Sequence, residues 1–409
     1  MSLSGPYRDR IGAYNQALNA FVDLSDFSEE VGLCYGVKSN IAVQGLPWTA
    51  GIAAYRDRIA KQDATVVSRI RRHGGTILGT VNMHEGALGA TTDNEAYGRT
   101  GNPWHFGRTP GGSSGGSGSA VAAGLCDVAL GSDTMGSVRI PAAYCGVQGH
   151  KPTTGIVPND GVVALSHTLD HVGPLARSVD MLWQSMHVLA DWGIMSSLEP
   201  SSLSGVRLGV WAGNGSVEMT SAVAAGFKNA LRSLEGAGVT LIENVEPPAY
   251  SYGRSRRAGL LISEVEAMRV HGDMIKAHPD GFSAVFKKLL AWGAARSADE
   301  IEAAYQHVRE VHAGAASLFS DVDFVISPTA PQQAFRFDEP APANQADFTA
   351  WADFAALPAT ALYTGLSVEN GLPLSLQIMG AEGRDRDTLQ LAAAMEKLFG
   401  IPSVPPSFE

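Results

Sequence analysis

Residues 111–145 read GGSSGGSGSAVAAGLCDVALGSDTMGSVRIPAAYC, and the order of small, apolar and polar residues in this stretch decides the fold. Two glycine-rich turns each carry a serine, Ser113 in the first turn and Ser137 in the second, 24 residues later. Between them, AVAAGL is typical of an apolar helix and CDVALG of an apolar strand. The stretch therefore predicts a turn, a helix, a strand and a second turn inside an α/β protein.

The first glycine-rich turn has three other possible interpretations: a flexible tether, a phosphate-binding loop or a nucleophile elbow. Each one fits the sequence less well than a turn that packs closely inside the α/β fold. A flexible tether has this composition, but a tether seldom runs directly into an apolar helix and strand. A phosphate-binding loop needs a lysine and then serine or threonine after its last glycine, where this chain has Gly118 and Ser119. The letters GSSGG at 112–116 match a nucleophile elbow, but no strand comes directly before them.

A lysine in a second apolar segment has the setting of a buried base. Lys38 lies in CYGVKSNIAVQG, 75 residues before Ser113, and apolar residues flank it on both sides. Free lysine titrates near pH ~10.4, but burial disfavours the charged ammonium and lowers the pKa by several units. A buried Lys38 is therefore expected to be partly neutral and able to accept a proton.

The order of residues in these segments and the spacings between Lys38, Ser113 and Ser137 resemble the amidase signature family, whose catalytic triad is serine, cis-serine and lysine. The resemblance implies that Ser137 is the nucleophile, that Ser113 bridges it to the base, and that Lys38 is that base. It also implies that the peptide bond between Gly112 and Ser113 is cis. The oxyanion hole is expected to consist of four backbone N–H groups, those of Thr134, Met135, Gly136 and Ser137.

The chain departs from the family pattern at two positions. The family usually has Gly-Gly-Ser in the second turn, whereas this chain has Met135 before Gly136 and Ser137. Two outcomes are open: Met135 is tolerated with its amide still pointing inward, or it reshapes the acyl pocket. The family usually has aspartate after the lysine, where this chain has Ser39. The loss of that negative charge favours a lower pKa for Lys38.

The resemblance also suggests where a substrate binds. The segment VNMHEGALGATTDN at 81–94 resembles the family loop that borders the acyl pocket, and it makes Met83, Glu85 and Gly89 wall or support residues. Glu85 is expected to be structural. Ser114 is expected to contact substrate, and Arg309 in AYQHVREVH resembles the arginine that binds an amino-acid carboxylate in amidotransferase A subunits.

The alternation of apolar strand and helix patterns predicts an α/β protein, and the resemblance implies one domain over 1–409 with a mixed β-sheet core covered by helices on both faces. Its parts are a catalytic core at 30–195, a variable substrate-shaping region at 200–310, and a return of strand and helix at 320–400. Residues 7–22 have the spacing of a helix, and 332–348 are expected to form a long surface loop.

Composition limits the location and the partners. The net charge of −11 gives no sign of a polyanion-binding surface, so no direct nucleic-acid contact is expected. The arginines at 254, 256 and 257 are expected to lie on a solvated helix face. No apolar run is long enough to span a membrane, and the three cysteines suit a reduced cytoplasm. The resemblance requires no metal or organic cofactor, and a homodimer is one assembly that it allows.

The main functional hypothesis is hydrolysis of a small carboxamide to a carboxylic acid and ammonia through an acyl-enzyme on Ser137. One alternative is the A-type catalytic subunit of a glutamine-dependent tRNA amidotransferase, which shares the triad but works with a tRNA-binding partner. Another alternative is a catalytically silent binding protein on the same fold. The intact Lys38, Ser113 and Ser137 argue against the silent alternative.

Overall fold

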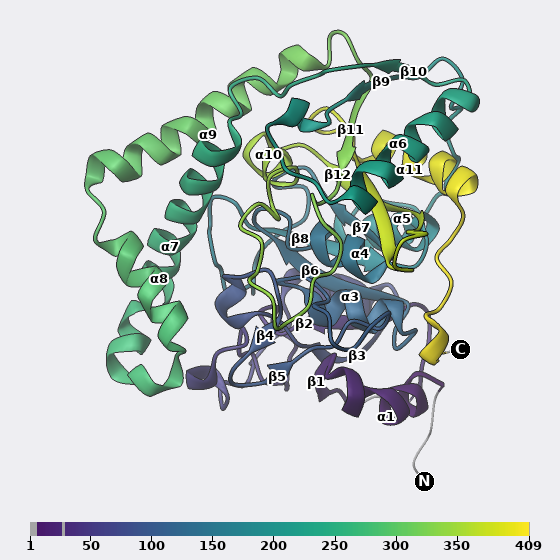
Figure 1. Cartoon of the computed structure of the whole chain (residues 1–409). Helices are drawn as coiled ribbons and strands as arrows, with labels where there is room; N and C mark the ends of the chain where they lie inside the picture. The colour runs from purple at the N-terminus through teal and green to yellow at the C-terminus, as the bar shows by residue number, and fades with distance from the viewer. Residues whose placement is uncertain (1–5, 27–28, 409) are drawn as a thin grey trace.

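The centre of the molecule is a mixed sheet in the order β1-β3-β2-β6-β8-β7-β12-β13-β11-β9-β10. The computed structural model describes residues 6–26 and 29–408. In Figure 1 the sheet runs from β1 at the bottom to β9 and β10 at the top. Its eleven strands are β1 (Phe21–Leu24), β2 (Cys34–Lys38), β3 (Thr76–Val81), β6 (Val128–Asp133), β7 (Gln148–Lys151), β8 (His171–Ala176), β9 (Arg207–Val210), β10 (Thr240–Ile242), β11 (Phe324–Pro328), β12 (Ala359–Leu366) and β13 (Pro373–Met379).

Helices cover both faces of the sheet, as the sequence predicts. Side chains alternate between faces along a strand, so Val128 and Leu130 of β6 face one apolar cluster and Ala129 faces another. The first cluster includes α2, α5, α6 and α11, and the second includes α1, α3 and α4. The helices of the described residues are α1 (Pro6–Leu18), α2 (Thr65–Arg72), α3 (Gly115–Ala122), α4 (Arg139–Cys145), α5 (Val179–Leu189), α6 (Ser221–Gly236), α7 (Tyr252–Ala277), α8 (Ala284–Ala294), α9 (Ala298–Leu318), α10 (Ala350–Phe354) and α11 (Asp385–Phe399).

The pairing of β2 with its neighbours positions the lysine. β2 is parallel to both β3 and β6, with Val37 opposite Leu130 on β6. Parallel strands end at the same edge of a sheet. Lys38, the last residue of β2, therefore lies at the edge where β6 ends at Asp133 and the Ser137 turn (residues 134–138) begins.

The N-terminal helix is shorter than its apolar spacing predicts. α1 ends at Leu18, and Asn19 adopts a left-handed φ of 51° that stops the helix. The Asn15 side chain then accepts hydrogen bonds from the N–H groups of Ala20 and Phe21 at 2.9 and 2.7 Å. Phe21–Leu24 form β1 because they pair with β3. This pairing joins distant parts of the chain, so the apolar spacing of residues 7–22 could not predict it.

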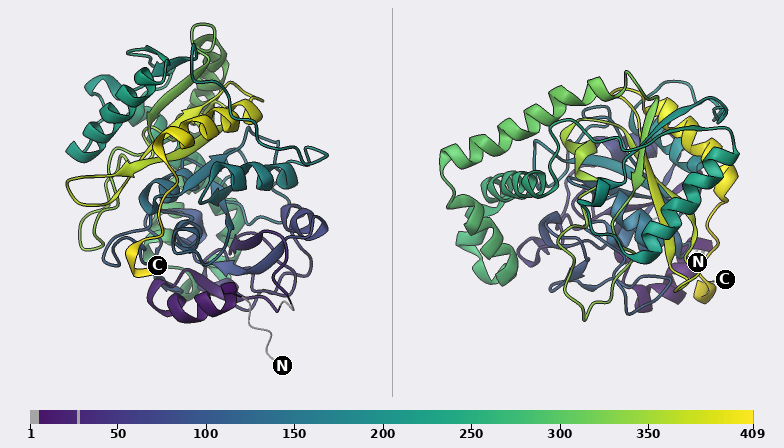
Figure 2. Two further views of the ribbon diagram at one scale, coloured as in Figure 1. Left: turned by 90° about the vertical axis from the view of Figure 1, so that its right-hand side faces the viewer. Right: turned by 45° about the horizontal axis from the view of Figure 1, so that its top comes forward.

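Helices α7, α8 and α9 form an arm on one side of the sheet, at the left in Figure 1 and again in the right-hand view of Figure 2. The loop at 332–348 is only partly a surface loop, which corrects the expectation. Phe335 and Phe348 are buried, and the residues from Pro342 to Ala346 include four that line a cavity beside the Ser137 turn. Among the described residues, no helix has the length and apolar content needed to cross a membrane.

Candidate active site

Lys38 is fully buried at the end of β2 and is held by two hydroxyl groups. Its Nζ donates hydrogen bonds to Ser113 Oγ at 2.7 Å and to Ser132 Oγ at 2.9 Å. Asn40 Nδ2 also donates to Ser132 Oγ, at 3.1 Å, which fixes that hydroxyl beside the lysine. The amine therefore points at Ser113 with little freedom to turn away.

The electrostatic setting of Lys38 favours the neutral amine. Burial lowers its pKa to about 7, although the charges of Asp170 and Asp133 act in the opposite direction. A group with this pKa is divided between its two protonation states near neutral pH. It is thus suited to accept a proton from a hydroxyl and to return it.

The first glycine-rich turn carries Ser113 to the lysine. The peptide bond between Gly112 and Ser113 is cis, as the resemblance implies. A Cβ at Gly112 would lie 2.7 Å from backbone atoms of Ala90 and Thr91, so the close packing of this turn requires glycine. The Ser113 carbonyl accepts a hydrogen bond from the N–H of His84 at 3.0 Å, which ties the turn to the segment after β3.

The Ser137 turn joins the end of β6 to the start of α4 and lies beside the first turn. The N–H of Ser114 donates to the carbonyl of Ser137 at 3.3 Å. Gly136 has a φ of +129°, and a Cβ there would lie 2.2 Å from Thr349 Oγ1. Thr349 Oγ1 donates to the carbonyl of Met135 at 2.6 Å. The backbone path to Ser137 is therefore fixed from both sides.

One of the four N–H groups expected in the oxyanion hole is already bound to a protein carboxylate, and the other three are not. The N–H of Gly136 donates to Asp133 Oδ1 at 2.5 Å, so it is not free for a substrate. Within residues 6–26 and 29–408, the N–H groups of Thr134, Met135 and Ser137 donate to no protein acceptor. Three of the four expected amides are thus available to an oxyanion.

A buried ion cluster supports the turn from beneath. Arg139 is fully buried, and its guanidinium bonds both oxygens of Asp133 at 3.0 Å and Asp353 Oδ2 at 2.7 Å. It also donates to the carbonyl of Thr349 and to Gln377 Oε1. Burial alone would raise the pKa of Asp133, but the Arg139 charge and hydrogen bonds hold it well below its usual range. The ionised carboxylate can therefore bind the Gly136 N–H.

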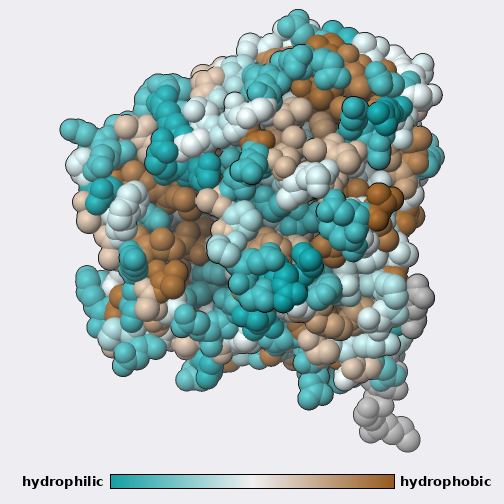
Figure 3. Space-filling model, in the orientation of Figure 1, coloured by the Kyte–Doolittle hydropathy of each residue, from teal (hydrophilic) through white to brown (hydrophobic). Residues whose placement is uncertain are grey.

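A cavity of about 150 Å³ lies in front of Ser137. Its apolar walls come from four separate segments, represented by Leu88, Ile140, Leu165 and Leu260. Its polar side chains, besides Ser137 and Thr134, are Arg256, Ser263 and Gln345. Figure 3 shows apolar surface in a hollow where the arm of α7 and α8 meets the body. The volume suits a substrate group of a few heavy atoms, since each liquid water occupies about 30 Å³.

Comparison with known proteins identifies the family. A family model described as Amidase matches residues 31–389. The chain belongs to the amidase family. This confirms the resemblance that the two serine turns and the lysine suggest.

The amidase-family chain is similar to proteins with more than one activity. The A subunit of the glutamyl-tRNA(Gln) amidotransferase of Halothermothrix orenii is 31% identical over 97% of this chain and 92% of its own length. The crystal structure of the corresponding protein from Thermotoga maritima superposes with a TM-score of 0.83 and 28% identity over 97% of this chain and 93% of that one. A 6-aminohexanoate cyclic dimer hydrolase, complexed with its substrate, gives a TM-score of 0.87 and 26% identity over 98% and 94%.

The amidase fold does not bring the three expected substrate-binding residues to the cavity. Met83 is fully buried in an apolar cluster, because it follows β3 into the interior. Ser114 Oγ donates to the Ser132 carbonyl at 3.2 Å and lies within the core. Arg309 lines a different hollow beside α9, where it is exposed and bonds Glu302. None of the three lines the cavity beside Ser137, so their contact with substrate stays a prediction.

The two remaining predictions from the 81–94 segment have different outcomes. Gly89 lines the cavity, and a Cβ there would overlap the His84 ring at 2.2 Å from Nε2. Glu85 Oε1 accepts from the N–H of Ser283, the residue that caps α8, at 3.0 Å. Glu85 therefore joins the arm to the body, which is the structural role expected of it.

The sequence pattern does not reveal Ser132, Arg256 and Gln345 as site residues. Arg256 is expected on a solvated helix face, but its side chain is only 28% exposed, pairs with Asp347 at 3.3 Å and lines the cavity. Arg256, Leu260 and Ser263 have the spacing of one helix face, which is the signal that the sequence offers. Ser132 lies one residue before the end of β6, and only the parallel pairing shows its contact with Lys38.

Proposed function

We propose that this amidase-family chain hydrolyses the C–N bond of a small carboxamide, with Ser137 as the nucleophile and Ser113 and Lys38 as its proton relay. The observation that carries the proposal is the 2.7 Å hydrogen bond between a fully buried Lys38 amine and Ser113, beside the Ser137 turn. A buried lysine held against a serine is a poor structural element, because desolvation of its charge costs free energy. It is a good base for the same reason.

The reaction begins when neutral Lys38 accepts the proton of Ser113 and Ser113 accepts that of Ser137. The Ser137 oxygen then attacks the amide carbonyl and forms a tetrahedral oxyanion. The N–H groups of Thr134, Met135 and Ser137 stabilise the oxyanion, and they need no reorganisation because the turn is already fixed. The proton returns through Ser113 to the leaving nitrogen as the C–N bond breaks. Water then attacks the acyl-enzyme by the same relay and releases the acid.

A second candidate places the same chemistry in an amidotransferase. Sequence similarity favours it more directly than a stand-alone amidase, because an A subunit of glutamyl-tRNA(Gln) amidotransferase is 31% identical to this chain over 97% of its length. In that setting the amide would be glutamine, and the ammonia would pass to a reaction on a partner. The polar lining residues Arg256 and Gln345 are suited to bind a charged or polar acyl group.

The first experiment measures ammonia release by the purified chain alone, beside Ser137→Ala. The panel comprises glutamine, asparagine, malonamide, short aliphatic amides and aryl acetamides. Release that disappears in Ser137→Ala supports a stand-alone amidase and identifies its acyl group. A fluorophosphonate adduct on Ser137 without any release supports the partner-dependent candidate. A chain that neither releases ammonia nor forms the adduct is a silent binding protein, which overturns the proposal.

A further inference from the structure

The side chain of Met135 occupies the junction between the Ser137 turn and helix α7. It is partly buried in the apolar cluster of α7, α9 and α10, and it also lines the cavity with Ser137. Met135 precedes Ser137 by only two residues, so any group bound to Ser137 lies close to it. Its size is thus relevant to what the cavity can hold.

The Met135 side chain packs against helix α7 at Gly259, where the helix has no side chain. A Cβ at Gly259 would lie 2.2 Å from Met135 Sδ and 2.9 Å from the Phe354 ring. Arg256, Leu260 and Ser263 line the cavity from the same helix, so Gly259 lies in the middle of the helix face that closes it. The Met135 sulfur fills the space that a side chain at Gly259 would occupy, which we call the notch.

The backbone around Met135 is held by hydrogen bonds on both sides. The Met135 carbonyl accepts a hydrogen bond from Thr349 Oγ1 at 2.6 Å, and the next N–H, that of Gly136, is held by Asp133. Thr349 is itself fully buried. The wall therefore depends on the side chain of Met135 and on the notch behind it, and not on turn flexibility.

We propose that Met135 forms the wall of the acyl pocket toward α7 and sets the longest acyl group that reaches Ser137, with Gly259 as the residue that allows it to sit there. The inference rests on the proposed function of Ser137 as nucleophile. Shortening Met135 opens the cavity to Gly259 and Phe354. Adding a side chain at Gly259 forces the thioether out of its notch and into the cavity.

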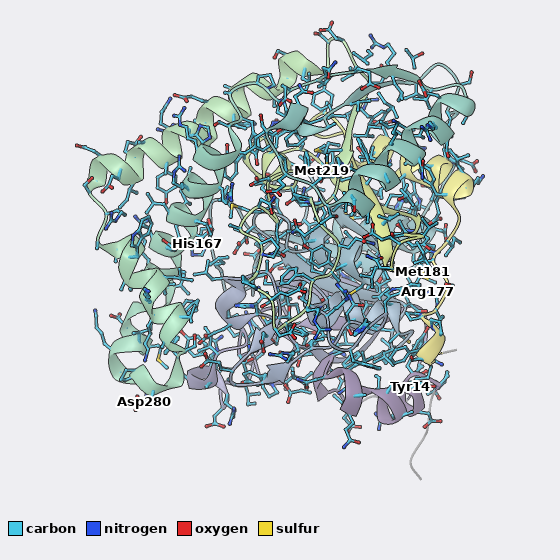
Figure 4. All side chains as sticks on the ribbon, viewed as in Figure 1. Tyr14, His167, Arg177, Met181, Met219 and Asp280 are labelled. Carbon is cyan, nitrogen blue, oxygen red and sulfur yellow. The ribbon has the colours of Figure 1, made fainter. Side chains whose placement is uncertain are left out.

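The test uses alkyl fluorophosphonates with chains from methyl to hexyl, and it measures the rate at which each one labels Ser137. Amide hydrolysis from acetamide to hexanamide is followed in parallel. Met135→Ala is expected to raise the ratio of hexyl to methyl labelling at least about tenfold, since one methylene in an apolar pocket is worth about 10- to 200-fold. Met219→Ala is the matched control. Met219, labelled in Figure 4, is a partly buried methionine of the same cluster that does not line the cavity, and its loss should leave the ratio unchanged.

Gly259→Ala supplies the reverse test and a check against misfolding. Labelling should fall at least about tenfold for every chain length beyond methyl, and Met135→Ala added to Gly259→Ala should restore it. An unchanged length profile in Met135→Ala, or a Gly259→Ala defect that the double variant retains, overturns the inference while Ser137 still reacts. Failure of wild-type Ser137 to react with any probe overturns the proposed function itself.

Discussion

The Ser137 turn and the cavity wall opposite it are built from different kinds of sequence. The turn, Lys38 and Ser113 come from 34–145, where glycines, a buried strand end and hydrogen-bonded hydroxyls fix each group. The wall comes from α7 and the loop at 332–348, whose residues resemble ordinary helix and loop positions in the sequence. The proposed reacting groups are thus fixed by close packing around two turns, whereas the wall that Met135 of the Ser137 turn meets is assembled from distant segments.

The largest effect is expected from removal of the proposed nucleophile, Ser137, or of the proposed base, Lys38. Ser137→Ala and Lys38→Ala should each lower kcat/KM for amide hydrolysis at least about 10⁴-fold, as expected for members of one catalytic unit. Ser113→Ala should retain a residual rate, because Lys38 can then act through water. The exposed Ser317 of α9 gives a control, and Ser317→Ala should match wild type. Wild-type kinetics in Ser137→Ala would remove the basis of the mechanism.

The next largest effect is expected on stability, from loss of Arg139 in the ion cluster beneath the Ser137 turn. Arg139→Met leaves the ionised Asp133 carboxylate buried without the guanidinium that pairs with it, and should lower the free energy of unfolding by about 3–5 kcal/mol. Urea unfolding measures the loss. Arg99→Met is the control, because its pair with Asp93 is half exposed and worth less than about 1 kcal/mol. Equal stability of the two variants would show that the turn does not depend on the cluster.

The rate of hydrolysis and the stability should both depend on pH through the ionisation of the buried Lys38. Because burial lowers the pKa of Lys38 to about 7, hydrolysis should rise with pH through this value and level off above it. Between pH ~7 and pH ~10 the Lys38 amine keeps its proton in the unfolded chain and loses it in the folded chain, so Lys38 contributes a rise of stability with pH of up to ~1.4 kcal/mol per unit. Lys38→Met should flatten that rise in urea unfolding. A wild-type rate that stays level across the neutral pH range contradicts this role for Lys38.

The wall residues should affect substrate binding more than the chemical step. Arg256→Ala should raise KM about tenfold for a substrate with a carboxylate or polar acyl group, with kcat nearly unchanged, because one charge-assisted hydrogen bond of ~1.5 kcal/mol is lost. Steady-state kinetics separate the two constants. Arg254→Ala is the matched control, since Arg254 comes from the same turn of α7 but pairs with Glu310 at the surface. A fall in kcat alone in Arg256→Ala would assign that residue to the chemistry and end the contrast between the two regions.

Several elements can be predicted because their signals are local. The alternation of apolar strands and helices gives the α/β class, and the stops at Gly74 and Gly400 mark the ends of α2 and α11. The helix predicted over 7–22 extends too far because the pairing of β1 with β3 is not encoded in the helix pattern. Arg309 lines a hollow other than the one beside Ser137, and the sequence could not predict this because an arginine on a helix face carries no signal of which hollow it enters.

The sequence by itself determined the family and the α/β class, and it marked Lys38, Ser113 and Ser137 as candidate catalytic residues. It did so because closely packed glycine turns and a lysine in an apolar strand leave few alternatives for those positions. Only the tertiary structure decided that Gly136 gives its N–H to Asp133, that Arg256 faces the cavity, and that Met135 fits against Gly259. Each of these depends on which distant atom arrives within a few ångströms, and that distance is fixed by packing of the whole chain.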